Sequence, residues 1–146
     1  MKRSALHRWH EKGGATLAEH NGWYVPMRYS NAEQEAGAVS GTVGICDVSH
    51  IHEPLSPYAR FLIAGPNARA LLSKLTSLNL DLSTAFGAVA HVRSLVTRHN
   101  LAFLMPGFLL DVPRDYAESV WEAVLHAGEE FHITPFGLEA HRRLEA

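Results

Sequence analysis

Apolar residues in the second half of the chain recur at two spacings, one typical of strands and one typical of helices. Alternating or β-branched runs predict strands at residues 58–64, 88–97, 101–112 and 131–134. Helices are predicted to begin at Pro66 and Pro113, because proline favours the first turn of a helix. Their apolar faces comprise Leu71, Leu72, Leu75 and Leu78 in the first helix and Tyr116, Val120, Trp121, Val124 and Leu125 in the second.

Over residues 58–134 these elements follow the order β-α-β-β-α-β. Pro106 and Gly107 interrupt the third run, which is therefore either two strands or one bulged strand. The order is that of the split βαβ, ferredoxin-like arrangement, in which right-handed crossovers place both helices on one face of a mainly antiparallel sheet. The pattern therefore predicts an α+β fold with a ferredoxin-like sheet.

The first 52 residues lack this regular alternation, and we interpret them as an N-terminal helical arm that wraps against the sheet. A helix is predicted at residues 4–12 with Ser4 as its N-cap, and another at 31–39 capped by Ser30 or Asn31. Residues 45–51 are predicted to be extended, and residues 137–146 to hold a C-terminal helix. A length of 146 residues fits one domain, so residues 1–146 are taken as a single unit.

Composition narrows the class of protein. The apolar fraction is 47% and the net charge is −2, which is typical of a globular protein and offers no cationic field for nucleic acid or acidic membranes. The longest apolar run, residues 101–105, is far too short to span a bilayer. Cys46 is the only cysteine, so an internal disulfide is excluded. A soluble, cytoplasmic protein without nucleic-acid or membrane partners is expected.

No catalytic constellation emerges from the residue types alone. His7 and His10 are one helical turn apart and His50 and His52 flank Ile51, but no further ligand lies at a recognisable offset, so no metal site is predicted. Cys46 followed by His50 is interpreted as a small core residue near a histidine rather than a nucleophile and its base. The remaining candidates are carboxylates that stand alone or in solvated runs, namely Asp81, Asp111, Glu129 and Glu130.

Three stretches together resemble the glycine cleavage system T-protein (aminomethyltransferase) family. The first, from Gly14 to Ser30, contains GWYVPMRYS and is similar to the family's GW..P..Y pattern. The second, from Glu35 to His50, is the most specific and reads EAGAV followed by GICDVSH, similar to E..AV….G..DVSH. The third, from Phe108 to Ala146, reads VPRDYAESVWEAVLHAG and then PFGLEAHRRLEA.

The departures from the family pattern bear on activity. The family's Gly-Gly-x-x-Asp-Asp type of segment has no counterpart between Thr76 and Phe108, and no glutamate stands where the family carries Thr-Gly-Glu. The sequence ends at RLEA, where the family continues into further domains. In this shortening the chain resembles the gamma subunit of heterotetrameric sarcosine oxidase.

The resemblance implies a T-protein-like folate-binding domain of one-carbon metabolism, with tetrahydrofolate as the candidate cofactor and Tyr29, Ile51 and Arg143 as the candidate folate-binding residues. Catalytic residues remain unassigned. We expect a folate-binding or partner subunit, in a homo-oligomer or a heteromeric oxidase or transferase, that is catalytically incomplete alone. The alternatives are an active tetrahydrofolate-dependent aminomethyltransferase and a structural subunit without ligand. The segment 137–146, with Leu138 and Leu144 beside two arginines, is the candidate partner contact.

Overall fold

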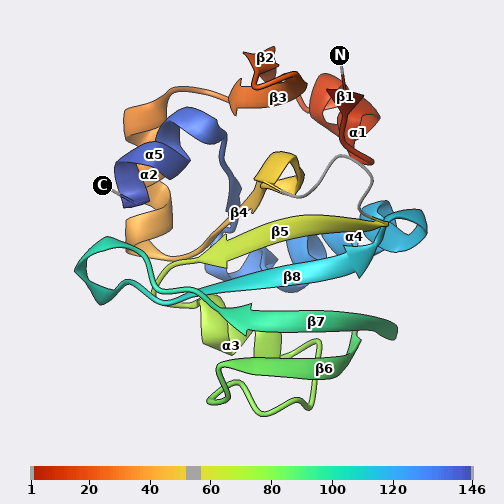
Figure 1. Ribbon diagram of the computed structural model, residues 1–146. Helices are drawn as coiled ribbons and strands as arrows, with labels where there is room; N and C mark the ends of the chain where they lie inside the picture. The colour runs from red at the N-terminus through yellow and green to blue at the C-terminus, as the bar shows by residue number, and fades with distance from the viewer. Residues whose placement is uncertain (1, 52–56, 146) are drawn as a thin grey trace.

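Two β-sheets of unequal size organise the protein (Figure 1). The structure, a computed structural model, describes residues 2–51 and 57–145. The strands are β1 Lys2–Arg3, β2 Thr16–His20, β3 Trp23–Arg28, β4 Gly44–Asp47, β5 Tyr58–Ala64, β6 Thr84–Val89, β7 Val92–Arg98, β8 Gly107–Pro113 and β9 Thr134–Pro135. The α-helices are α1 His7–Lys12, α2 Ala32–Gly41, α3 Ala68–Ser73, α4 Ala117–Ala127 and α5 Leu138–Glu145. Short 3-10 helices are η1 Ser49–Ile51, η2 Ala102–Leu104, η3 Arg114–Tyr116 and η4 Glu129–Phe131.

The larger sheet has the strand order β6-β7-β8-β5-β4-β9. All of its neighbours are antiparallel except β4 and β9, which are parallel. Helices α3 and α4 pack on one face, where Leu72 and Trp121 meet inward-facing residues such as Phe61. The alternate residues of the same strands, such as Leu62, point to the other face and pack against α2 and α5. Both faces of the sheet centre are therefore covered, which explains why β4 is buried throughout.

The predicted α+β class is confirmed, and the predicted strand runs share one mainly antiparallel sheet with α3 and α4 on one face, but the ferredoxin-like arrangement is not confirmed. Strand β4, assigned to the arm, lies between β5 and β9, so the last strand pairs with β4 and not with residues 58–64. The run 88–97 belongs to two strands, β6 and β7, joined by a turn at Ala90 and His91. Both turn residues have left-handed φ values (52° and 68°), which sequence rules associate with Gly or Asn, so the hairpin was missed.

The N-terminal segment that was predicted to be a helical arm contains more regular secondary structure than expected. Its strands β1, β3 and β2 form a separate sheet, and α2 and β4 join the main body. Asn31 caps α2 through a 2.8 Å hydrogen bond from the backbone N–H of Gln34, as predicted. Ser4 does not cap α1, which begins at His7; its hydroxyl is bound elsewhere.

Three further boundaries differ from the prediction. Helix α3 ends at Ser73, so Leu75 and Leu78 pack on the core from the following loop. The run 101–112 divides into a turn and strand β8. The run 131–134 becomes the end of η4 and the start of β9. No helix among residues 2–51 and 57–145 combines the length and apolar character needed to cross a bilayer.

Candidate functional site

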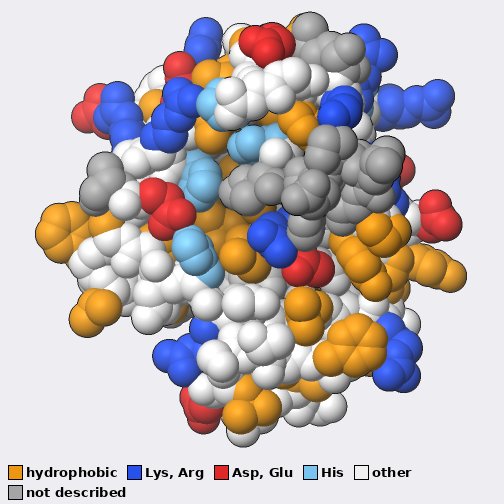
Figure 2. Space-filling model, in the orientation of Figure 1, with side chains coloured by type: hydrophobic (Ala, Val, Ile, Leu, Met, Phe, Trp, Pro, Cys, Tyr) orange, Lys and Arg blue, Asp and Glu red, His pale blue; other side chains and the backbone are white. Residues whose placement is uncertain are grey.

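Imidazole and guanidinium groups from four separate segments meet on one side of the molecule. We call this set the histidine face: it comprises His20, His50, His99, His141, Arg142 and Glu145. The rings of His20 and His50 are perpendicular, with centroids 5.6 Å apart. Arg142 donates a hydrogen bond from Nη2 to Nδ1 of His20 at 3.2 Å. Figure 2 shows histidine side chains gathered on this side of the molecule.

Glu145 provides the negative charge of the histidine face. Its Oε2 lies 2.9 Å from Nε2 of His99 and 3.4 Å from Nε2 of His141. Among the described residues, no hydrogen bond or ion pair joins a carboxylate to the side chains of His20, His50 or Arg142. This part of the histidine face can therefore accommodate a negatively charged or hydrogen-bonding group.

Two of these histidines have lowered pKa values. Burial lowers the pKa of His50, and His20, His141 and Arg142 act in the same direction, while Asp47 opposes them. Burial also lowers the pKa of His141, with Glu145 opposing and His99 and Arg142 contributing to the decrease. Near neutral pH these rings are therefore uncharged, so each can both donate and accept a hydrogen bond. Nδ1 of His50 is enclosed and has no hydrogen-bond partner in the described part of the chain.

The local sequence Asp47-Val48-Ser49-His50 explains how His50 is positioned. Oδ1 of Asp47 accepts hydrogen bonds from the backbone N–H and the hydroxyl of Ser49, at 3.0 and 2.6 Å. This Asx-type turn redirects the chain from β4 into η1. Ser49 also accepts a 3.0 Å hydrogen bond from the backbone N–H of Arg60, which ties the turn to β5. Val48 is fully buried beneath it, so His50 stands on a fixed support.

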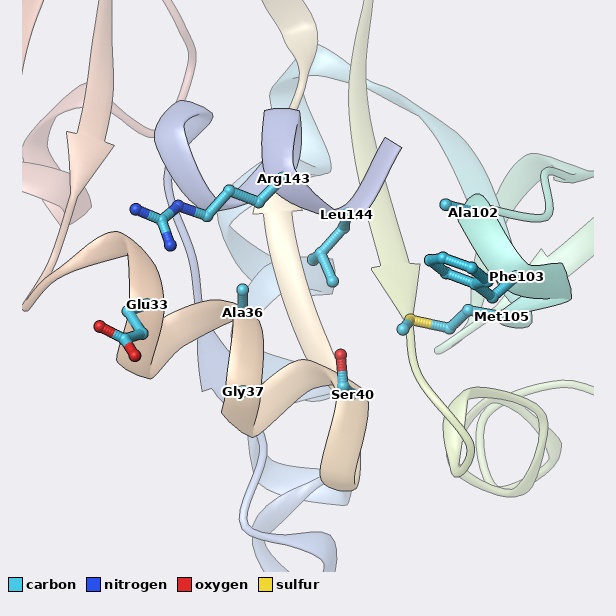
Figure 3. A pocket seen from close by; sticks show the side chains of 9 residues that line it. All are labelled: Glu33, Ala36, Gly37, Ser40, Ala102, Phe103, Met105, Arg143 and Leu144. Carbon is cyan, nitrogen blue, oxygen red and sulfur yellow. The ribbon is translucent and has the colours of Figure 1, made fainter. Parts of the chain in front are cut away.

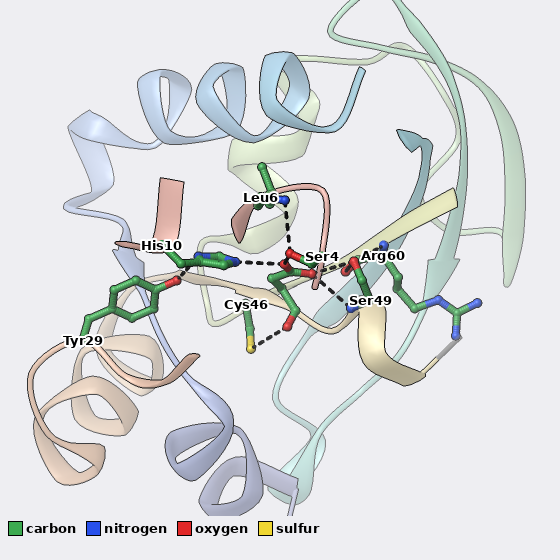
Figure 4. Close-up of polar contacts among 8 residues, drawn as sticks. Ser4, Leu6, His10, Tyr29, Cys46, Ser49 and Arg60 are labelled. Atoms are coloured by element: carbon green, nitrogen blue, oxygen red, sulfur yellow. Dashed lines mark hydrogen bonds and ion pairs between the residues drawn. The ribbon is translucent and has the colours of Figure 1, made fainter. Parts of the chain in front are cut away.

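Behind the histidine face, the other oxygen of Asp47 holds a buried polar network (Figure 4). Asp47 Oδ2 accepts hydrogen bonds from the Ser4 hydroxyl at 2.5 Å and from Nε2 of His10 at 2.9 Å. Because Nε2 donates to a carboxylate, Nδ1 of His10 is the acceptor for the Tyr29 hydroxyl, 2.7 Å away. Burial by itself raises the pKa of Asp47, but the hydrogen bonds from His10, Ser4 and Ser49 outweigh it and the pKa lies below its ordinary value.

The structure separates the three residues that the resemblance assigned to folate. Tyr29 is held by His10, and burial raises the pKa of its hydroxyl far above the ordinary value. Ile51 ends η1 beside His50, and its side chain lies outside the described part of the structure. Arg143 is exposed on α5 and lines a hollow of about 300 Å³ between α2 and the turn at 102–105 (Figure 3). Its neighbour Arg142, which the sequence reasoning missed, is the arginine that reaches the histidine face.

The other candidates from the sequence have structural roles. Cys46 is buried in the core, and burial raises the pKa of its thiol well above the ordinary value. Asp111 forms a two-point ion pair with Arg60, at 2.7 and 3.1 Å, and Asp81 pairs with Arg69 at 2.9 Å. His7 contacts Glu11 while His10 contacts Asp47, and His52 lies outside the described residues. Within residues 2–51 and 57–145, no group of three or more His, Cys, Asp or Glu residues is arranged to hold a metal.

Comparison with known proteins places the chain in a family. Residues 52–146 match the family model described as the GCVT N-terminal domain. An aminomethyltransferase of Chlorobium luteolum is 38% identical over 81 residues, covering 56% of this chain and 20% of the relative. An aminomethyltransferase of Moorella thermoacetica is 34% identical over 84 residues, covering 58% and 21% respectively. The chain thus matches about a fifth of the length of these curated relatives.

The fold comparison covers almost the whole chain. The crystal structure of the glycine cleavage system aminomethyltransferase T from Bartonella henselae superimposes with a TM-score of 0.74 at 17% identity. The match covers 99% of this chain and 62% of that protein. The N-terminal sheet and the main sheet therefore have counterparts in that single protein.

Proposed function

Because the chain belongs to the glycine cleavage T-protein family, we propose that it is a shortened T-protein-like subunit that binds a folate-type ligand on its histidine face. The proposal extends to tetrahydrofolate as the ligand and to one-carbon metabolism as the process. It keeps the earlier expectation that the chain does not complete aminomethyl transfer alone. A cytoplasmic location remains part of the proposal.

One observation carries the proposal: Nδ1 of the half-buried His50 ring has no partner among the described residues, and this ring stands with His20 and Arg142 on the histidine face. A pterin ring is flat and carries alternating donors and acceptors, which neutral imidazoles can match. The glutamate tail of a folate is anionic and suits a guanidinium group. A small number of precisely placed polar groups commonly fixes the orientation of a ligand in a small-molecule site.

The same geometry supports the view that chemistry is incomplete. General acid–base catalysis needs a titrating group that can reach the substrate. Asp47 is buried and saturated with hydrogen bonds from three side chains, and Glu145 is shared between two histidines. Neither carboxylate is free to assist the transfer of a one-carbon unit. A partner subunit that supplies such a group, or closes the ligand on its open side, is therefore part of the proposal.

Isothermal titration with tetrahydrofolate and its 5-formyl form tests the proposal. We expect saturable binding that His50→Ala and Arg142→Ala each weaken by about 10-fold, since each removes one hydrogen bond to a polar or charged ligand group. Arg143→Ala is the matched control, because it changes the neighbouring arginine of the same helix and leaves the histidine face intact.

The outcomes separate the alternatives. Loss of folate binding in Arg143→Ala with normal binding in Arg142→Ala would mean that folate binds at the residues implied by the family resemblance and not on the histidine face. No binding of either folate by the parent chain would overturn the proposal and favour a structural subunit without ligand.

A further inference from the structure

The turn before β8 presents two large apolar side chains to solvent. Phe103 is fully exposed and Leu104 is 81% exposed, the highest values among the exposed large apolar residues of the described chain. Both have φ values of 59°, in the left-handed region that bulky residues seldom adopt. An exposed and conformationally costly pair of apolar residues is typical of a binding feature.

This turn is firmly held at its base. Leu101 is buried in the core beneath the sheet, and its backbone N–H donates to the carbonyl of Met105 at 2.9 Å. Met105 packs against the same core cluster, and the carbonyl of Pro106 accepts from the N–H of Gly65 at 2.9 Å. Phe103 therefore projects from a fixed base, which limits the entropy lost when it docks.

A hollow lies directly beside this turn, and Phe103 forms part of its wall (Figure 3). Its volume is about 300 Å³, and small residues of α2 form its floor: Ala36, Gly37 and Ser40. A Cβ atom at Gly37 would meet nothing within 4 Å, so this position opens into free space. Glu33 and Arg143 supply one negative and one positive charge to the lining.

We propose that this surface joins two copies of the chain about a two-fold axis, with Phe103 of each copy inserted in the hollow of the other. A two-fold contact requires a patch that is complementary to itself, and a projection next to a hollow meets that requirement. The charges are compatible with this pairing, because the lining carries one charge of each sign, Glu33 and Arg143, so two identical surfaces can offer each other an opposite charge. A partner that carried charges of only one sign would complement either Glu33 or Arg143, but not both.

The dimer does not depend on the folate proposal. The hollow is lined from α2, α5 and the turn at 102–105, whereas His20, His50 and Arg142 lie outside it. The structure leaves fewer residues available for the candidate partner contact within residues 137–146. Leu138 and Leu144 are buried in the chain's own core, so only exposed residues such as Arg143 can make that contact.

Sedimentation equilibrium over a concentration series tests the proposal on the full chain. The parent is expected to approach twice the 16.1 kDa chain mass. Phe103→Asn removes the projection, and asparagine tolerates a left-handed φ. Gly37→Leu fills the hollow, and it improves the helix propensity of α2. Each is expected to weaken dimerisation by roughly 30-fold, as loss of a central anchor does.

Phe86→Ala is the matched control, since Phe86 is an exposed phenylalanine on β6 outside the hollow. It should dimerise like the parent. Mixing Phe103→Asn with Gly37→Leu should partly restore dimers, because Phe103 of the Gly37→Leu variant can enter the hollow of the Phe103→Asn variant, whose floor on α2 is unchanged. A parent that stays monomeric at all concentrations, or a dimer that neither variant weakens, would overturn the proposal. Folate binding by Phe103→Asn should be unchanged, which separates the dimer contact from the ligand site.

Discussion

The buried carboxylate of Glu35 accepts a 2.9 Å hydrogen bond from the backbone N–H of Gly137, which lies 102 residues further along the chain. Its other oxygen accepts from the backbone N–H groups of Tyr29 and Ser30, both at 2.8 Å. Glu35 thus joins the end of β3, the helix α2 and the start of α5. The side chain is 1% exposed, so water does not replace these bonds.

Glu35→Gln is expected to lower the free energy of unfolding by about 2–4 kcal/mol, because three N–H groups bind the carboxylate and an amide turns one of its ends into a donor. Urea unfolding measures the change. Glu33→Gln is the control on an exposed position of the same helix and should stay within about 0.5 kcal/mol of the parent. Equal stability of the two variants would contradict this role for Glu35.

Val124→Asp is expected to destabilise the fold by several kcal/mol, on the order of 3–5, or to force a protonated aspartate into the core. Val124 is completely buried in the core cluster between α4 and the main sheet. Ser119→Asp places the same side chain on the exposed side of α4 and should leave the melting temperature nearly unchanged. If Val124→Asp melts at the same temperature as the parent and as Ser119→Asp, the buried position of Val124 is contradicted.

The lowered pKa values of His50 and His141 predict a loss of stability as the solution becomes mildly acidic. Below the ordinary imidazole pKa of 6.5 the unfolded chain binds protons that the folded chain still excludes, so stability falls with pH until the folded-state pKa values are passed. Unfolding in urea at pH 7.5 and pH 5.5 measures the slope. His50→Gln should flatten part of it; an unchanged slope would mean that His50 is not buried in its neutral form.

Aminomethyl transfer to tetrahydrofolate is expected to be absent from the purified chain. Correctly placed acid–base groups commonly supply 10²- to 10⁴-fold each, and neither Asp47 nor Glu145 is free for this role. Formaldehyde or ammonia release from an aminomethyl donor, followed with and without tetrahydrofolate, is the measurement. A turnover number of about one per second would place the chain among complete transferases.

The strands and helices that the sequence predicted well carry both a clear period and a clear stop. Strand β5 has the predicted bounds, since its apolar run ends at Gly65 and Pro66. Helix α4 shows the predicted face because Val120, Trp121 and Val124 repeat at helical spacing. Strand β4 was misplaced because its four residues are buried on both sides, so no alternation marks it as part of a sheet.

The candidate site depended on contacts that local pattern does not encode. Ser4, His10 and Tyr29 converge on Asp47 from three separate segments. Arg142 and Arg143 are adjacent, and successive helical residues point about 100° apart. Which arginine meets His20 is therefore decided by the way α5 docks on α2 and β3, which is a tertiary property.

The parallel pairing of β4 with β9 has a consequence for how the protein folds. Gly44 and Ile45 pair with Thr134 and Pro135, each 90 residues further along the chain. Until this pairing forms, the outer edge of β4 has no neighbouring strand, and Phe136 does not yet cover Val39. The pairing that completes this edge of the main sheet therefore joins residues 90 positions apart, and such a non-local contact is expected to form later in folding than the local hairpin of β6 and β7.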